Sequence, residues 1–123
     1  MLADYLETLA ETRLFENFTV AEIKKFLNLG SWNIKKYTKG TIIHFQNEEC
    51  RSLDIILDGS VAVQKFNENG NILTVSVFSA KEIIGANLLF STQNKYPLMI
   101  VADSPVVILH LYKETIALFM KHH

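Results

Sequence analysis

Residues 1–30 carry apolar side chains spaced as on one face of a helix. A first helix is predicted by an i, i+3, i+4, i+7 stripe made of Leu2, Tyr5, Leu6 and Leu9. A second helix is predicted to start at Thr19, because Thr19 and Glu22 form a capping-box pattern ahead of further apolar residues. Gly30 follows that run, at a place where helices commonly end in a glycine of positive φ. We therefore expect two short helices, the second ending at Gly30.

From residue 31 the apolar period changes to two, which is typical of β-strands. Turn residues recur about every 8–12 positions, a pattern of all-β barrels and jelly rolls. Asp58-Gly59 predicts a hairpin, because both residues tolerate positive φ, and a second turn is predicted at residues 67–70. Helical spacing returns after Tyr112 and predicts a closing helix. Strands are expected near residues 32–37, 41–45, 53–57, 61–66, 72–78, 82–84, 98–102 and 106–112.

Composition indicates a single globular domain. The chain has 123 residues, of which 49% are hydrophobic and 11% aromatic, which is material for one core but not for two. Twelve Lys and Arg residues against thirteen Asp and Glu residues leave a formal charge of −1, so the basic surface needed for nucleic-acid binding is lacking. The start of the chain does not read as a signal peptide, and no apolar run approaches the ~18 residues of a membrane span. We expect a cytoplasmic domain without membrane contact.

The histidines do not predict a metal site. His44 and His110 are the two in the β region, and neither has the closely spaced second histidine and nearby carboxylate of a cupin-type metalloenzyme. His122 and His123 are adjacent, so on a helix they would point apart and suit no shared ion. Ordinary surface or core histidines are favoured, with no metal and no cofactor, and a cupin-type enzyme stays as a minor alternative.

Nucleophilic catalysis is not indicated either. The chain has no Gly-x-Ser-x-Gly motif, and its single cysteine, Cys50, lies in a polar loop beside Glu48 and Glu49. Neighbouring carboxylates disfavour a thiolate, so we expect an incidental, exposed or half-buried cysteine. The chain is therefore expected not to be an enzyme.

Several segments together resemble the N-terminal effector domain of the Crp/Fnr transcription regulators. Residues 39–43 match the opening turn of its β-roll, residues 56–63 its hairpin around Gly59, and residues 67–70 its next turn. Residues 84–90 are similar to the start of its phosphate-binding cassette, and Val101-Ala102 to the end. The resemblance implies a mainly β fold with flanking helices, the double-stranded β-helix (jelly roll) of cyclic-nucleotide-binding domains. It divides the chain into helices (1–30), roll (31–112) and the start of a C-terminal helix (113–123).

The cassette departs from the family pattern at the positions that bind cyclic nucleotides. Where the family has a ribose-binding Glu this chain has Ala86, and where it has a phosphate-pairing Arg it has Tyr96, followed by Pro97. Loss of a paired Arg typically costs ~3–5 kcal/mol, so binding of cAMP or cGMP is not expected. The candidate ligand-binding residues in this degenerate cassette are Ile84, Gly85, Ala86, Asn87, Leu88, Leu89, Tyr96, Pro97 and Leu98.

Two interpretations of the cassette stay open. It could hold a small apolar or aromatic effector, with Tyr96 as the polar anchor, or it could be collapsed and vestigial. The first makes the chain the sensor domain of a bacterial regulator that is a homodimer in full length and reads DNA through a helix-turn-helix module absent from this chain. The second makes it a ligand-free dimerisation or protein-interaction module, which exposed Ile116 and Phe119 on the closing helix would support.

Overall fold

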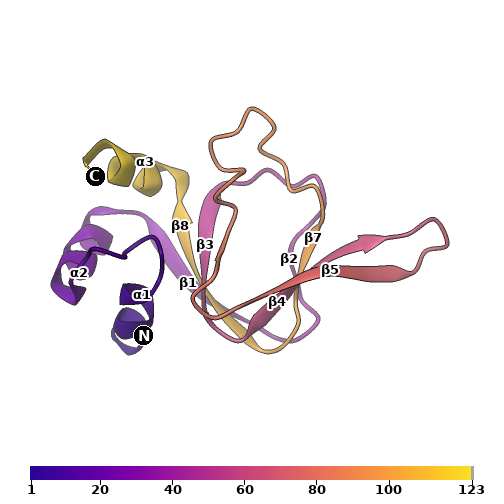
Figure 1. The fold of residues 1–123 in the computed structure, drawn as a ribbon, viewed down its shortest axis with the longest axis horizontal. Coiled ribbons are helices and arrows are strands. Elements are labelled where there is room, and N and C mark those ends of the chain that lie inside the picture. The colour runs from indigo at the N-terminus through magenta and orange to yellow at the C-terminus, as the bar shows by residue number, and fades with distance from the viewer. Residues whose placement is uncertain (123) are drawn as a thin grey trace.

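The computed structural model describes residues 1–122, as two antiparallel sheets with three helices gathered at one end (Figure 1). One sheet has the strand order β1-β8-β3-β6 and the other β2-β7-β4-β5. This arrangement confirms the predicted mainly β jelly roll with flanking helices. The elements are the 3₁₀ turn Leu2–Tyr5, α1 (Leu6–Ala10), α2 (Val20–Leu29), β1 (Trp32–Tyr37), β2 (Ile42–His44), β3 (Ser52–Asp58), β4 (Ser60–Phe66), β5 (Ile72–Ser79), β6 (Ile83–Ile84), β7 (Met99–Ala102), β8 (Val106–Tyr112) and α3 (Lys113–His122).

The predicted start of α2 is confirmed, whereas the predicted geometry of its end is wrong. Thr19 accepts a hydrogen bond from the Glu22 amide and Glu22 accepts one from the Thr19 amide, so both halves of the capping box are present. Gly30 has φ −113°, an extended conformation open to any residue. A Cβ there would lie 2.4 Å from Cγ2 of Thr115, so a close approach of α3 is what requires glycine.

The Asp58-Gly59 pair does not make the predicted hairpin. β3 pairs with β6 and β8, whereas β4 pairs with β5 and β7, so the chain passes from one sheet to the other at this point. Gly59 does have positive φ (+83°), and a Cβ would lie 2.2 Å from the backbone oxygen of Pro105. Glycine is needed here because a crossover corner packs directly against the loop before β8.

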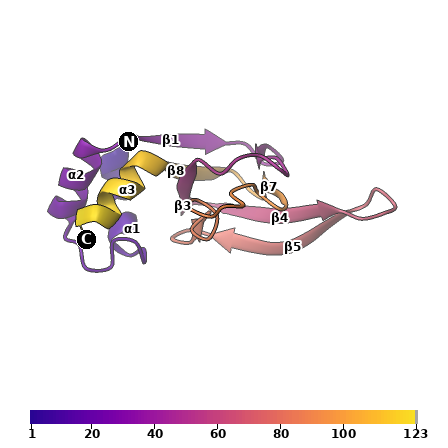
Figure 2. The same ribbon diagram turned by 90° about the horizontal axis from the view of Figure 1, so that it is seen from above.

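The second predicted turn is confirmed as the tip of the β4–β5 hairpin. Asn67 Oδ1 accepts hydrogen bonds from the amides of Asn69 and Asn71, and Gly70 has φ +79°. The hairpin extends beyond the rest of the roll (Figures 1 and 2). Apolar side chains along the protruding part are consequently exposed, among them Phe66, Ile72, Val75 and Val77.

An aromatic cluster joins the N-terminal helices to α3. The ring of Phe15 lies 5.5 Å from Phe18, 5.8 Å from Phe26 and 6.3 Å from Phe119, measured between centroids. Figure 2 shows α3 lying beside α1 and α2 at this end of the molecule. Helices cover one side of the β1-β8-β3 sheet and the second sheet covers the other, so β3 and β8 are buried along nearly their whole length.

Candidate functional site

A polar cluster lies inside the roll, where the two sheets face each other. Asp54 of β3 stands opposite His110 of β8 in the strand register, and His44 reaches them from β2 of the other sheet. All three side chains are buried, and Asp54 has no exposed surface. The cluster places polar side chains among the mainly apolar residues of β3 and β8, which gives the interior of the roll a local charge.

The cluster is a chain of hydrogen bonds centred on Asp54. His44 Nε2 donates to Asp54 Oδ2 at 2.6 Å, and His110 Nδ1 donates to Asp54 Oδ1 at 2.6 Å. Ser52 Oγ donates to the same Oδ1 at 2.7 Å. At the outer ends, Tyr37 Oη lies 2.8 Å from His110 Nε2, and Glu48 is hydrogen-bonded to His44 Nδ1.

Electrostatics favour a charged centre despite its burial. Burial alone would raise the pKa of Asp54, but the hydrogen bonds and charges of His110 and His44 lower it below its usual value. Burial alone would lower the pKa of His44, but its bonds to Asp54 and Glu48 outweigh that effect and raise the pKa. Burial raises the pKa of Tyr37 to about 12, so its phenol stays protonated beside His110. Asp54 is thus an ionised acceptor held between two imidazoles.

Tyr96 connects this cluster to the cassette. Its ring stacks on His44, with centroids 4.3 Å apart and planes at 11°, and 2% of its surface is exposed. Its hydroxyl lies 3.7 Å from Cys50 Sγ, and a Cβ on Gly85 would lie 3.5 Å from that hydroxyl. The fold therefore brings together two of the predicted cassette residues, Gly85 and Tyr96, with Cys50 against both.

Cys50 is buried, which contradicts the expectation of an exposed or half-buried thiol. Its exposed fraction is 1%, and its Sγ lies 3.3 Å from the backbone oxygen of Ser52. The pKa of this thiol is raised, as expected, but chiefly by burial and only secondarily by the charges of Asp54 and Glu48. A polar local sequence did not indicate that the loop folds inward over the end of the roll.

The remaining cassette residues divide between core and surface. Gly85 has φ +93°, and the chain after it forms a turn in which the amides of Leu88 and Leu89 donate to its oxygen. Ile84 and Leu89 are buried, Leu88 and Leu98 are half-buried, and the exposed members are Ala86, Asn87 and Pro97.

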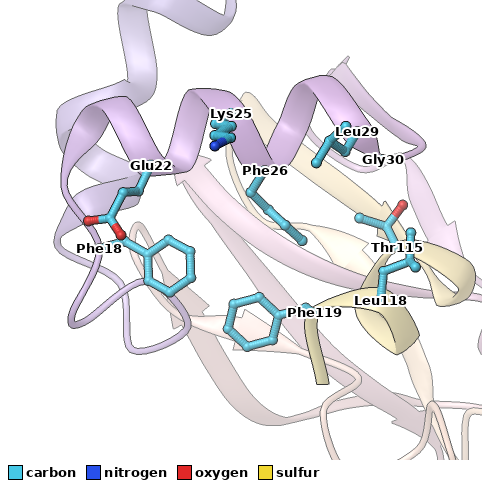
Figure 3. Close-up of a pocket in the computed structure, with 9 residues that line it drawn as sticks. All are labelled: Phe18, Glu22, Lys25, Phe26, Leu29, Gly30, Thr115, Leu118 and Phe119. Carbon is cyan, nitrogen blue, oxygen red and sulfur yellow. The ribbon is translucent and has the colours of Figure 1, made fainter. Parts of the chain in front are cut away.

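Two hollows lie outside the cassette, one at the polar cluster and one between helices. One, of about 400 Å³, is lined by His44, His110 and Tyr37 and rimmed by charged side chains including Lys35 and Arg51. The other, of about 510 Å³, lies between α2 and α3 (Figure 3). Its lining is mainly apolar and comprises Phe18, Glu22, Lys25, Phe26, Leu29, Gly30, Thr115, Leu118 and Phe119.

Asp54, the carboxylate partner of His44 and His110, was not among the site residues predicted from the sequence. Asp54 is separated from them by 10 and 56 residues, so local spacing carries no sign of the contact. A signal was nevertheless present, because Asp54 and His110 each stand inside an apolar strand, where a polar residue needs a partner. The expected divergence of the histidine pair at the chain end lies outside the described side chains.

The chain belongs to the cyclic nucleotide-binding domain family. The sequence model of that family matches residues 34–123, which contain the whole roll except the start of β1. This agrees with the resemblance identified from the sequence. No curated protein matches the chain, and no helix in residues 1–122 is long and apolar enough to cross a membrane.

Solved structures with the same fold include several bacterial regulators. A transcriptional regulator from Thermotoga maritima is 29% identical over 80% of this chain and 76% of its own, with a TM-score of 0.68. The sensor domain of the transcriptional regulator DNR from Pseudomonas aeruginosa has a TM-score of 0.81 at 15% identity, covering 97% of this chain and 78% of its own. The catabolite activator protein from Thermus thermophilus has a TM-score of 0.72 at 17% identity, covering 89% of this chain. This chain spans 50% of the Thermus protein and 54% of a similar protein from Silicibacter pomeroyi.

Proposed function

We propose that the chain is the effector-sensing domain of a bacterial Crp/Fnr-type transcription regulator, and that its effector is not cAMP. The observation that carries the sensor role is the likeness, over 97% of the chain, to a domain that serves as the sensor of a transcriptional regulator. DNA contact would come from a module outside these residues, and the full-length protein would be a homodimer. The regulatory role would be non-catalytic.

The cassette supports the exclusion of cAMP. By the resemblance, Tyr96 stands where cyclic-nucleotide binders place the phosphate-pairing Arg, and here the ring is buried against His44. The methyl group of Ala86 offers no acceptor to a ribose hydroxyl. A missing partner for a buried charge costs ~3–5 kcal/mol, equivalent to a loss in affinity of roughly 100-fold or more.

Calorimetry tests the exclusion directly. We expect no saturable heat when cAMP or cGMP is titrated to about 1 mM. The control is PfPKA-R, a protein with a similar fold (TM-score 0.71, 24% identity) whose solved structure is cAMP-bound, and it should give a full isotherm under the same conditions. Micromolar binding of either nucleotide by this chain would overturn the argument from Ala86 and Tyr96.

A thermal-shift screen tests the sensor role. A saturable rise in Tm of a few degrees with a phenolic or other aromatic ligand would support an effector site. Tyr96→Phe removes the proposed polar anchor and keeps the ring, so it should abolish that shift without lowering the Tm of the free protein. Tyr5→Phe, far from the cassette in sequence, is the matched control and should leave the shift unchanged.

One observation favours the second candidate, a ligand-free interaction module. That observation is the exposure of two apolar side chains of α3, Leu118 by 45% and Met120 by 61%. They are not the two that were expected to be exposed, because Ile116 is buried and Phe119 packs in the aromatic cluster. If no ligand raises the Tm and the chain self-associates in sedimentation velocity, with Leu118→Ser and Met120→Ser abolishing association, the interaction module is the better description.

A further inference from the structure

His44, Asp54 and His110 bring three metal-ligating side chains to one point inside the roll. Each offers one donor atom, and these atoms all lie within 4.8 Å of one another. The donors come from three strands, with β2 in one sheet and β3 and β8 in the other. Separate strands of a two-sheet scaffold hold donors more rigidly than a loop does, as a preformed metal site requires.

The two imidazole rings are already oriented as metal ligands are. Glu48 is hydrogen-bonded to Nδ1 of His44, which leaves Nε2 facing Asp54. Tyr37 is hydrogen-bonded to Nε2 of His110, which leaves Nδ1 facing the same carboxylate. Partners on the far nitrogen of each ring are the usual outer shell of histidine metal ligands, because they set ring orientation and donor basicity.

The geometry points to a binding site for a first-row transition-metal dication such as Zn²⁺, held by His44 Nε2, Asp54 and His110 Nδ1. Two imidazoles and a carboxylate form a nitrogen–oxygen set that suits such ions, whereas Cys50 bonds backbone oxygens and Tyr96 instead. Three protein ligands leave at least one coordination position for water or another small ligand.

An ion has a path of access, and the three donors have to shift to hold it. The two imidazole nitrogens lie 2.6 Å from the carboxylate oxygens, whereas ligands around tetrahedral Zn²⁺ are ~3.3 Å apart, so the carboxylate has to move away from each ring by ~0.7 Å. The three donor atoms lie within 4.8 Å of one another, so any pair that is wider than the ligand separation has to draw together. Both histidines line the hollow of about 400 Å³, which gives an ion a path from solvent. Asp54 lies behind them with no exposed surface. A bound ion would join the two sheets and, through the ring of Tyr96 on His44, contact the cassette.

To test the site, the chelator-stripped chain is titrated with Zn²⁺, and binding is measured by calorimetry and by thermal shift. We expect one ion per chain and a Tm that rises with Zn²⁺ concentration. Substituting Co²⁺ should give the visible absorption of a nitrogen–oxygen site without a thiolate charge-transfer band. Long-range ¹H–¹⁵N spectra of the wild-type chain should show the metal on Nε2 of His44 and on Nδ1 of His110, an assignment that adventitious binding would not reproduce.

Variants separate this site from others on the chain. Asp54→Asn and His110→Gln, each checked for folding by circular dichroism, should weaken Zn²⁺ binding by more than about 100-fold, and Glu48→Gln by about 10- to 100-fold. Glu49→Gln, an exposed carboxylate nearby, should bind as the wild type does. The double change His122→Ala and His123→Ala removes the terminal pair as a competing ligand and should also leave binding intact. Absence of binding, binding lost with the terminal pair, or histidine resonances unmoved by Zn²⁺ would each show that the cluster is a hydrogen-bonded network only.

Discussion

Replacing Asp54 by Asn should destabilise the chain far more than any exposed Asp to Asn change. Asp54 is fully buried and accepts hydrogen bonds from Ser52, His44 and His110. The amide has the same size but no charge, and its nitrogen is a donor where an imidazole also donates. One imidazole bond is broken and the other loses its charged acceptor, and disrupting a buried ion pair in this way typically costs ~3–5 kcal/mol.

Urea unfolding monitored by far-ultraviolet circular dichroism, with EDTA present to exclude any metal effect, measures this difference. Asp58→Asn is the matched control, since Asp58 ends the same strand and is exposed, and it should change the free energy of unfolding by less than ~0.5 kcal/mol. The slope with urea should be unchanged, so that the midpoint alone shifts. A loss below about 1 kcal/mol for Asp54→Asn would refute an ionised, bridging Asp54. Loss of folding in Asp54→Asn with an intact control would agree with it.

Three further predictions follow from burial and backbone geometry. Gly59→Ala should lower the free energy of unfolding by ~2–5 kcal/mol. The control Gly40→Ala, at a glycine with a similar φ (+87°) but nothing near its Cβ, should lower it by only about 1 kcal/mol. Equal losses would exclude the clash with Pro105. Iodoacetamide at pH 8 should modify Cys50 at least ~100-fold more slowly in the native than in the urea-unfolded chain, because the thiol is buried and its pKa is raised; rapid native labelling would contradict this. Phe15→Ala should cost ~3–5 kcal/mol in the same unfolding assay, against nearly nothing for exposed Phe66→Ala.

The order of elements could be predicted from the sequence because its signals are local. Apolar spacing distinguishes the helices from the roll, and the capping box at Thr19 and Glu22 marks the start of α2. The turn at residues 67–70 follows from side-chain bonds within a few residues. Family resemblance then connected these pieces into a jelly roll, which the family match and the sheets bear out.

Local signals were insufficient where a distant segment determines the backbone. Gly30 is required by the approach of Thr115, and Gly59 by the loop at Pro105, although each reads as an ordinary helix end or hairpin glycine. Cys50 lies in a polar stretch and is buried all the same, because the fold closes that loop over Gly85 and Tyr96. In these cases the residue is visible in the sequence, but the contact that explains it exists only in the folded chain.

The polar cluster was decided by tertiary structure alone. The sequence supplies two histidines and an aspartate whose separations resemble no motif. It indicates that Asp54 and His110, as polar residues inside apolar strands, need partners, but it does not say which residues those partners are. Pairing β3 with β8 sets Asp54 opposite His110, and the facing sheet brings His44 to the same point. Burial then makes the contact obligatory, because a charge removed from water must find partners within the protein.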